Sequence, residues 1–254
     1  MLPPERQTVI LERLADHGSV RTIELAAALE VTDETIRKDL EALELRGELQ
    51  RIHGGAVKPD RTRTELTLTE RQMVNREAKR AIARAAAARI QPNDTIFIDA
   101  SSTALTLTEF LPDFPITILT NAHNVVTALA GREGDIFCTG GLYEQRSRSY
   151  IGLSAEFALR KHNIHRMFFS GSAVDLDRGV SETNSRQAAF KERVIACSEE
   201  VCLLADSSKL GLKASFFFAQ SREINTLITN EDADPQFIRV VRELNIEVVQ
   251  APPL

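Results

Sequence analysis

The chain has 254 residues, of which 43% are hydrophobic and 26% are charged, and its formal net charge is −5. This length suits two domains, and the composition is that of globular proteins rather than of disordered or fibrous ones. There is no run of about 18 apolar residues and no basic segment leading into an apolar core, which argues against a membrane span and an export signal. Cys138, Cys197 and Cys202 lack the spacing of metal ligands, so we expect free thiols, no metal and a cytoplasmic location.

The first thirty residues predict two helices. Residues 4–17 carry apolar side chains on one face, which is typical of an amphipathic helix. Thr22 is a suitable cap for a short helix over residues 23–29, and residues 30–31 then form a tight turn. Two helices joined by a turn of about 3–4 residues make up the helix-turn-helix unit, so a third helix is expected directly after this turn.

The third helix is the candidate recognition helix. Thr32 or Asp33 can cap it, and its apolar positions recur at helical spacing at Ile36, Leu40, Leu43 and Leu45. This spacing leaves Thr35, Arg37 and Lys38 on another face near the helix N-terminus. That end of a helix meets base edges and phosphates when the helix enters the major groove.

A strand and a tight turn follow this helix. Gly47 is expected to end the helix, residues 49–52 to form a strand, and residues 53–55 to form a glycine turn, which together resemble a wing. The alternative is an amphipathic core helix followed by a hairpin without DNA. We expect DNA contact from these residues: Thr32, Glu34, Thr35, Arg37, Lys38, Arg51, His53, Gly54 and Gly55.

The charge of this segment limits how it can hold DNA. Residues 1–60 contain eight Lys and Arg against twelve Asp and Glu, a net charge of −4. A basic footprint is expected of a DNA-binding module, so here it must be local, at these residues: Arg37, Lys38, Arg51, Lys58, Arg61 and Arg63. We therefore expect weak non-specific affinity and the pairing of at least two such modules in a homo-oligomer.

These motifs resemble a known family. The segment ERQTVILERL, the core TIRKDL and the wing RIHGGA are similar to the DeoR family of bacterial sugar-operon repressors. The resemblance implies a winged helix-turn-helix domain at residues 1–58 that binds operator DNA.

The rest of the chain predicts a linker and an α/β domain. Residues 59–68 are polar and lack periodicity, as linkers do, and residues 69–90 predict one long helix. Strands are expected at 95–98, 116–119, 136–138, 167–169, 201–205, 226–228 and 247–249. Helices are expected between most of them, at 104–110, 125–130, 155–162, 186–197 and 235–244. This alternation predicts a wound parallel sheet in an α/β domain over residues 69–254.

Polar residues and glycines follow five of these strands. Ligands of such sheets bind beyond the C-terminal ends of the strands, and a phosphate is favoured where hydroxyls and N–H groups gather at a helix start. The alternative is that these residues are ordinary caps and turns. Five such ends together favour a binding site, with these candidates: Asp99, Ser101, Ser102, Thr103, Asn121, Gly140, Gly141, Gly171, Asp206 and Lys209.

This half also resembles the effector domain of the DeoR family, which is similar in fold to ribose-5-phosphate isomerase and glucosamine-6-phosphate deaminase. The resemblance rests on DASST, TN, the GG pair, AFK and ADSSK. It implies that Ser101, Ser102 and Thr103 hold a phosphate. It implies that the sugar is lined by Asp99, Asn121, Glu182, Lys191, Asp206 and Lys209.

Two positions in this half need separate comment. The family usually has glycine where Ser101 stands, and the variant DASST resembles regulators of the L-fucose type. Arg148 lies in a polar stretch after Gly141 that is either a solvated loop or a mobile flap over the ligand.

The sequence thus predicts a transcription regulator, a repressor of a sugar-catabolism operon, that binds operator DNA and a phosphorylated sugar and needs no cofactor. The alternative is an enzyme, a sugar-phosphate isomerase with an accessory DNA-binding domain, in which Glu182, Lys191 and Asp206 do acid–base work. A pure interaction module does not explain the polar strand ends.

Overall fold

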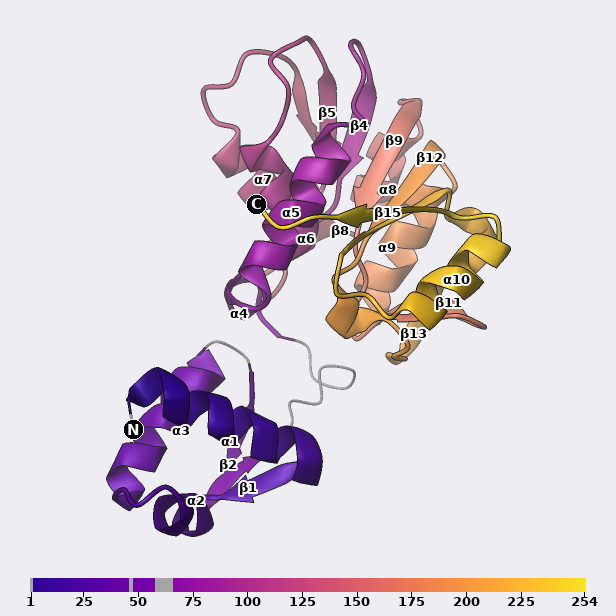
Figure 1. Cartoon of the computed structure of the whole chain (residues 1–254). Coiled ribbons are helices and arrows are strands. Elements are labelled where there is room, and N and C mark those ends of the chain that lie inside the picture. Colours follow the sequence, from indigo (N-terminus) through magenta and orange to yellow (C-terminus); the bar gives the residue numbers. More distant parts are fainter. Residues whose placement is uncertain (1, 46–47, 58–65) are drawn as a thin grey trace. The chain divides into compact units, whose positions relative to one another are not determined.

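A computed structural model describes residues 2–45, 48–57 and 66–254. The chain forms two compact units, residues 1–61 with 69–74 and residues 62–68 with 75–254 (Figure 1). The helix end at Gly47, the linker segment 58–65 and its basic residues Lys58, Arg61 and Arg63 lie outside the described residues. The boundaries 1–58, 59–68 and 69–254 stay a prediction.

The N-terminal unit is a helix-turn-helix with a wing. Its elements are α1 Pro3–His17, β1 Ser19–Arg21, α2 Thr22–Ala28, α3 Asp33–Leu45, β2 Gln50–Ile52 and β3 Gly55–Val57. The predicted helices, the strand after them and the glycine turn are confirmed, while β1 and β3 were not predicted. Strand β3 pairs with both β1 and β2, which gives the order β1-β3-β2. Thr22 is not the cap of α2 but its first residue, and its N–H donates to the Gly54 carbonyl of the wing.

One apolar cluster holds this unit together. Ile36, Leu40 and Leu43 of α3 are each at most 2% exposed and pack against Ile10 and Leu14 of α1. The predicted apolar face is therefore confirmed for these three positions, and burial of such side chains stabilises the fold by roughly 1.5–3 kcal/mol each.

The C-terminal unit contains a seven-stranded parallel sheet of order β15-β14-β12-β9-β4-β5-β6. Its strands are β4 Thr95–Ile98, β5 Thr117–Thr120, β6 Ile136–Cys138, β9 Ile164–Phe169, β12 Ser198–Leu204, β14 Thr226–Asn230 and β15 Glu247–Ala251. All seven predicted strands are present in this one sheet. The predicted α/β fold is thereby confirmed, and the C-terminal strand ends share one edge of the sheet.

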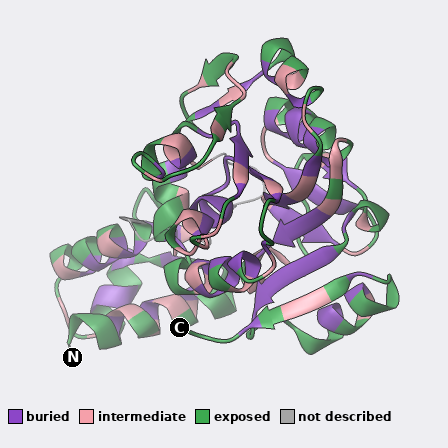
Figure 2. Ribbon diagram, turned by 90° about the horizontal axis from the view of Figure 1, so that it is seen from above, coloured by how far each residue is buried: buried purple, intermediate pink, exposed green. Residues whose placement is uncertain are grey.

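Helices cover both faces of the sheet. They are α5 Arg76–Ala87, α6 Ser102–Thr106 with the 3-10 turn Leu107–Glu109, α7 His123–Ala128, α8 Leu153–Leu159, α9 Ser185–Ile195 and α10 Pro235–Glu243. Ile96 and Ile98 pack with α5, α6 and α7, whereas Phe97 packs with α8, α9 and α10. Burial on both faces accounts for the nearly continuous apolar strands that the sequence contains, and the strands are mostly buried in Figure 2.

The long helix predicted at 69–90 is wrong. The structure has α4 Leu68–Met73 and α5 Arg76–Ala87, separated at Asn75, whose φ is +50°. A left-handed residue cannot continue a right-handed helix, and asparagine tolerates this conformation better than most residues. The Ala- and Arg-rich composition indicated helix on both sides but not the break.

Two small antiparallel elements were not predicted. Strands β10 Ala173–Asp175, β11 Gly179–Glu182 and β13 Phe216–Ala219 form a second sheet. The stretch expected to be a loop contains the hairpin of β7 Leu142–Glu144 and β8 Ser149–Ile151. Strands of three or four residues with little alternation give almost no periodic signal.

Candidate functional site

The recognition helix is capped as predicted. Thr32 Oγ1 accepts the N–H of Thr35 at 3.3 Å, which satisfies one of the free donors of the first turn. Arg37 and Lys38 are exposed one turn further on, and the Arg37 guanidinium lies 3.5 Å from the Glu34 carboxylate. This exposed pair is worth little for stability, so Arg37 is available to a phosphate or base.

A buried ion pair fixes the opposite side of this helix. Arg6 of α1 and Asp39 of α3 are 6% and 4% exposed, and the Arg6 guanidinium donates to both carboxylate oxygens of Asp39. Gln7 Nε2 donates to Asp39 as well, at 3.1 Å. The hydrogen bonds to Asp39 raise the pKa of Arg6, against the opposing effect of burial. This pair ties α3 to α1, and the sequence did not single out either residue.

Glycines shape the wing. Gly54 has φ +81°, and a Cβ at Gly55 would lie 2.0 Å from the Val20 carbonyl oxygen, so no larger residue fits where β3 meets β1. Gly55 is buried, whereas Gly54, His53 and Arg51 are exposed. The Arg51 backbone N–H donates to Glu44 at the end of α3 at 2.8 Å. Of the predicted DNA-contacting residues, Gly55 thus shapes the wing, while Arg51 and His53 present their side chains.

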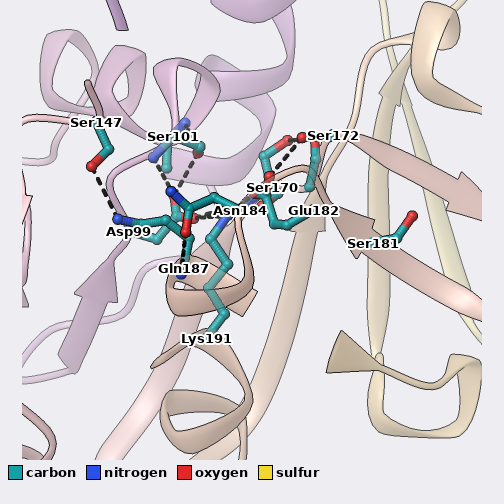
Figure 3. Close-up of polar contacts among 12 residues, drawn as sticks. Asp99, Ser101, Ser147, Ser170, Ser172, Ser181, Glu182, Asn184, Gln187 and Lys191 are labelled. Atoms are coloured by element: carbon teal, nitrogen blue, oxygen red, sulfur yellow. Dashed lines mark hydrogen bonds and ion pairs between the residues drawn. The ribbon is translucent and has the colours of Figure 1, made fainter. Parts of the chain in front are cut away.

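Three predicted residues form a buried charged cluster. Asp99 follows β4 of the parallel sheet, Glu182 ends β11 of the second sheet, and Lys191 lies on α9. Lys191 Nζ lies 3.0 Å from Asp99 Oδ2 and 2.5 Å from Glu182 Oε1 (Figure 3). Burial alone would lower the pKa of Lys191, but the charges of Asp99 and Glu182 outweigh it and raise that pKa. Lys191 is therefore charged at neutral pH.

Ser170 connects this cluster to the next strand end. Its carbonyl accepts Lys191 Nζ at 2.5 Å, and its hydroxyl accepts Lys209 Nζ at 2.7 Å. Asp206, 2% exposed, lies beside Lys209 and receives hydrogen bonds from Ser208 and from Asn75. Burial tends to raise the pKa of Asp206, but Lys209, Ser208, Lys79 and Asn75 together lower it.

The DASST loop presents buried oxygens. Ser101 has φ −77°, so this position does not need glycine, and its hydroxyl donates to Asp99 and accepts the Ala104 N–H. Thr103 is fully buried and Asn121 is 2% exposed. Thr103 Oγ1 and Asn121 Oδ1 have no hydrogen-bond partner among the described residues. Buried polar atoms without a partner are rare in native proteins and need an explanation.

The hairpin β7–β8 is held against α9 by a polar network that the sequence did not reveal. Gln187 Nε2 donates to Glu144 Oε2 at 2.6 Å and to the hydroxyls of Ser147 and Ser149 at 3.0 and 2.8 Å. Glu144 also accepts from Asn184 at 3.0 Å. Residues four apart on a helix share a face, so Gln187 and Lys191 of α9 point the same way.

The remaining predicted ligand-binding residues are three glycines and Arg148. Arg148 is exposed in the hairpin with φ +50°, and Gly140 and Gly141 precede β7 with φ +61° and +116°. A Cβ at Gly171 would lie 2.3 Å from Val180 Cγ1, so glycine lets the end of β9 approach β11. No bond joins Arg148, Gly140 or Gly141 to the charged cluster in the part of the chain that the structure describes.

The described residues contain no helix long and apolar enough to cross a membrane, and no group of three or more His, Cys, Asp or Glu among them is placed to hold a metal ion.

Comparison with known proteins assigns the chain to a family. Residues 6–62 match the DeoR-like helix-turn-helix domain, and residues 74–231 match the DeoR C terminal sensor domain. The chain belongs to the DeoR family. This DeoR-family protein is 36% identical to the uncharacterized HTH-type transcriptional regulator YulB of Bacillus subtilis, over 99% of this chain and 98% of that protein. It is 33% identical to the L-fucose operon activator of Haemophilus influenzae, over 89% of this chain and 91% of that protein.

The predicted identification, winged helix-turn-helix and α/β sensor domain are thus confirmed, and the protein is a DNA-binding transcription regulator rather than an enzyme. Among solved structures, ribose 5-phosphate isomerase A of Methanocaldococcus jannaschii aligns with a TM-score of 0.39 and 14% identity, over 54% of this chain and 55% of that one.

Proposed function

We propose that this DeoR-family protein binds operator DNA through α3 and the wing, and that a phosphorylated sugar bound at the strand ends of the sensor domain controls this binding. The buried cluster of Asp99, Glu182 and Lys191 carries the proposal. Burying three charges is costly and contributes little net stability, so such a cluster is more readily explained by ligand recognition than by folding.

Two further features support a polyol phosphate. Leaving a buried polar atom without a partner costs about 1–3 kcal/mol, and a sugar phosphate can supply both missing partners, its phosphate for Thr103 Oγ1 and a hydroxyl group for Asn121 Oδ1. Lys209 provides a cation beside Ser170. We assign the phosphate to the loop of Ser102 and Thr103 and the sugar hydroxyls to Asn121, Asp99 and Glu182.

Repression is the action that we propose. It needs only occupancy of the operator, whereas activation also needs a productive contact with the transcription machinery. The relative from Haemophilus influenzae is named an activator, so a reporter gene under the operator has to decide the sign. Because the DNA-binding module is acidic overall, we also propose a homo-oligomer that places two modules on repeated half-sites.

A thermal-shift screen tests the ligand. A ligand at about 100 times its Kd stabilises the native state by about 2.7 kcal/mol, which for a domain of this size raises the unfolding midpoint by roughly 5–10 °C. We expect this shift with one or more hexose or pentose phosphates and not with the unphosphorylated sugars. If no sugar phosphate in a broad panel raises the midpoint, the proposed ligand class is wrong.

The DNA contact has its own test. Arg37→Ala is expected to weaken operator binding by roughly 1–3 kcal/mol, about 5- to 150-fold, if the guanidinium binds a base edge in a bidentate way. The unfolding midpoint should not change, because Arg37 is exposed and off the apolar face. Gel-shift titration with an operator selected from random DNA measures the affinity. Arg13→Ala, which removes the same charge from a half-buried position on α1, is the matched control, and equal affinities of the two variants would remove Arg37 from the interface.

A further inference from the structure

Helix α4 Leu68–Met73 lies between two hydrogen-bonded contacts that are both made within the sensor unit. At the start of α4, the Leu68 N–H donates to the Arg146 carbonyl at 2.9 Å, and the Leu68 side chain is 3% exposed. Just beyond its end, Asn75 Nδ2 donates to Asp206 Oδ1 at 2.7 Å and to Ser208 Oγ at 2.9 Å. The residues between these two contacts, 69–74, group with the DNA-binding unit. The chain therefore leaves the sensor unit at one contact and re-enters it at the other.

Each contact involves a segment that belongs to the candidate sensor site. Arg146 directly precedes Ser147, whose hydroxyl lies 2.8 Å from Glu144 Oε2 and accepts from Gln187 of α9. The same helix carries Lys191, and Figure 3 shows Ser147, Gln187 and Lys191 in one group with Asp99. Asp206 follows β12 and is three residues from Lys209, which donates to Ser170. Each contact therefore joins a residue at or next to α4 to a segment of the candidate site.

The contact of Asn75 is a strong one. Hydrogen bonds to an ionised carboxylate are roughly twice as strong as those between neutral groups. Lys209, Ser208 and Lys79 hold the pKa of Asp206 low despite its burial, so the carboxylate that Asn75 reaches is ionised. An anion that attracts Lys209 takes one positively charged neighbour away from the Asp206 carboxylate. The Asp206 carboxylate then depends more on its remaining partners, one of which is Asn75.

We propose that the Asn75–Asp206 and Leu68–Arg146 contacts form a two-point linkage through which a ligand in the sensor site changes the setting of α4 and thereby the affinity for operator DNA. Asn75 is a positioning residue in this linkage, and it touches neither DNA nor ligand. The inference rests on the proposed function. The inference names the contacts that couple the sensor site to operator binding. A ligand can shift the equilibrium between two states only if these contacts differ between the states.

Asn75→Gly is the sharpest test. Glycine keeps the left-handed backbone at φ +50° without strain but removes the amide that binds Asp206 and Ser208. The measurement is the ratio of two operator Kd values, one with and one without a saturating sugar phosphate from the thermal-shift panel. The same ratio is measured with inorganic phosphate in place of the sugar phosphate. Allosteric coupling typically gives a ratio of about 5–150. We expect this ratio to fall at least about fivefold toward 1 in the variant, while the sugar phosphate still binds.

Asn245→Gly is the matched control. Asn245 is an exposed asparagine of the same unit with φ +61°, and no side-chain hydrogen bond is formed by it in the described part of the chain. It should keep the wild-type ratio. A role of Asn75 in stability alone would change the unfolding midpoint and leave the ratio unchanged, so an unchanged ratio overturns the proposal.

A substitution at Leu68 can remove the other contact, the hydrogen bond from the Leu68 N–H to the Arg146 carbonyl. Leu68 is the first residue of α4, where proline is tolerated, so Leu68→Pro removes the N–H that Arg146 accepts. Leu68→Ala loses a similar amount of side-chain packing but keeps that N–H. We expect the proline variant to reduce the ratio at least about threefold more than the alanine variant, and equal ratios contradict the role of this contact. Failure of wild type to bind any sugar phosphate would instead contradict the proposed function.

Discussion

Replacing Lys191 with methionine is expected to lower the free energy of unfolding of the sensor domain by about 3–5 kcal/mol. Methionine has a similar length and fills the space, so the loss is electrostatic: the carboxylates of Asp99 and Glu182, 1% and 7% exposed, lose the ammonium group between them. Chemical denaturation followed by circular dichroism measures the change. Adding Glu182→Gln removes one of the stranded charges, so the double variant should cost less than the sum of the single variants.

The pH dependence separates this effect from a packing defect. In wild type the pKa of folded Lys191 is raised, so its contribution is fully present below the ordinary lysine pKa and is lost as pH rises through the folded value. In Lys191→Met, the carboxylates of Asp99 and Glu182 lie buried together without the ammonium group, so adding a proton to one of them removes their repulsion. The stability deficit of the variant should therefore shrink as pH falls from 7 toward about 5. A deficit that is the same at both pH values would identify a cavity rather than stranded charge.

The parallel sheet was predictable because its signal is local. Most of its strands contain a short apolar run, because helices cover both faces of the sheet. Residues 96–98 of β4 and 167–169 of β9 are such runs, although His165 and Arg166 stand near the start of β9. The polar residues that follow them, Asp99 and Ser170 among others, then fall at one edge of the sheet by topology alone. The sequence could therefore name most members of the candidate site without any knowledge of the distances.

The pairing of these residues was not predictable. Glu182 stands at the end of a strand of the second sheet, and Gln187 bonds a hairpin some forty residues earlier in the chain. The Arg6–Asp39 pair likewise joins two helices through side chains that the sequence did not single out. Such contacts depend on tertiary packing, which residue spacing does not encode. The helix break at Asn75 was not predicted for a similar reason. Asn75 has a left-handed backbone, and its side chain forms hydrogen bonds to Asp206 and Ser208, which are distant in the sequence.

The second large effect is expected at the DASST loop, residues 99–103, because a charge placed there acts directly on the proposed ligand. Ser102 is the first residue of α6 and is 4% exposed. A carboxylate about 4 Å from a phosphate at an effective dielectric constant near 20 repels it by about 4 kcal/mol, and by about 1 kcal/mol if water intervenes. A value between these limits corresponds to roughly a hundredfold weaker binding.

Ser102→Glu is therefore expected to bind operator with wild-type affinity but to need roughly 100 times more sugar phosphate for the same response. Operator-binding titrations at rising sugar phosphate concentration measure this, with the selected operator duplex. Ser102→Ala, which removes the hydroxyl without adding charge, should lose much less. Ser215→Glu adds the same charge at an exposed position of the same domain and should respond as wild type does. If Ser102→Glu keeps its fold and responds at the same concentrations as Ser215→Glu, the phosphate does not bind at this loop, because a buried carboxylate beside it would have to repel the ligand.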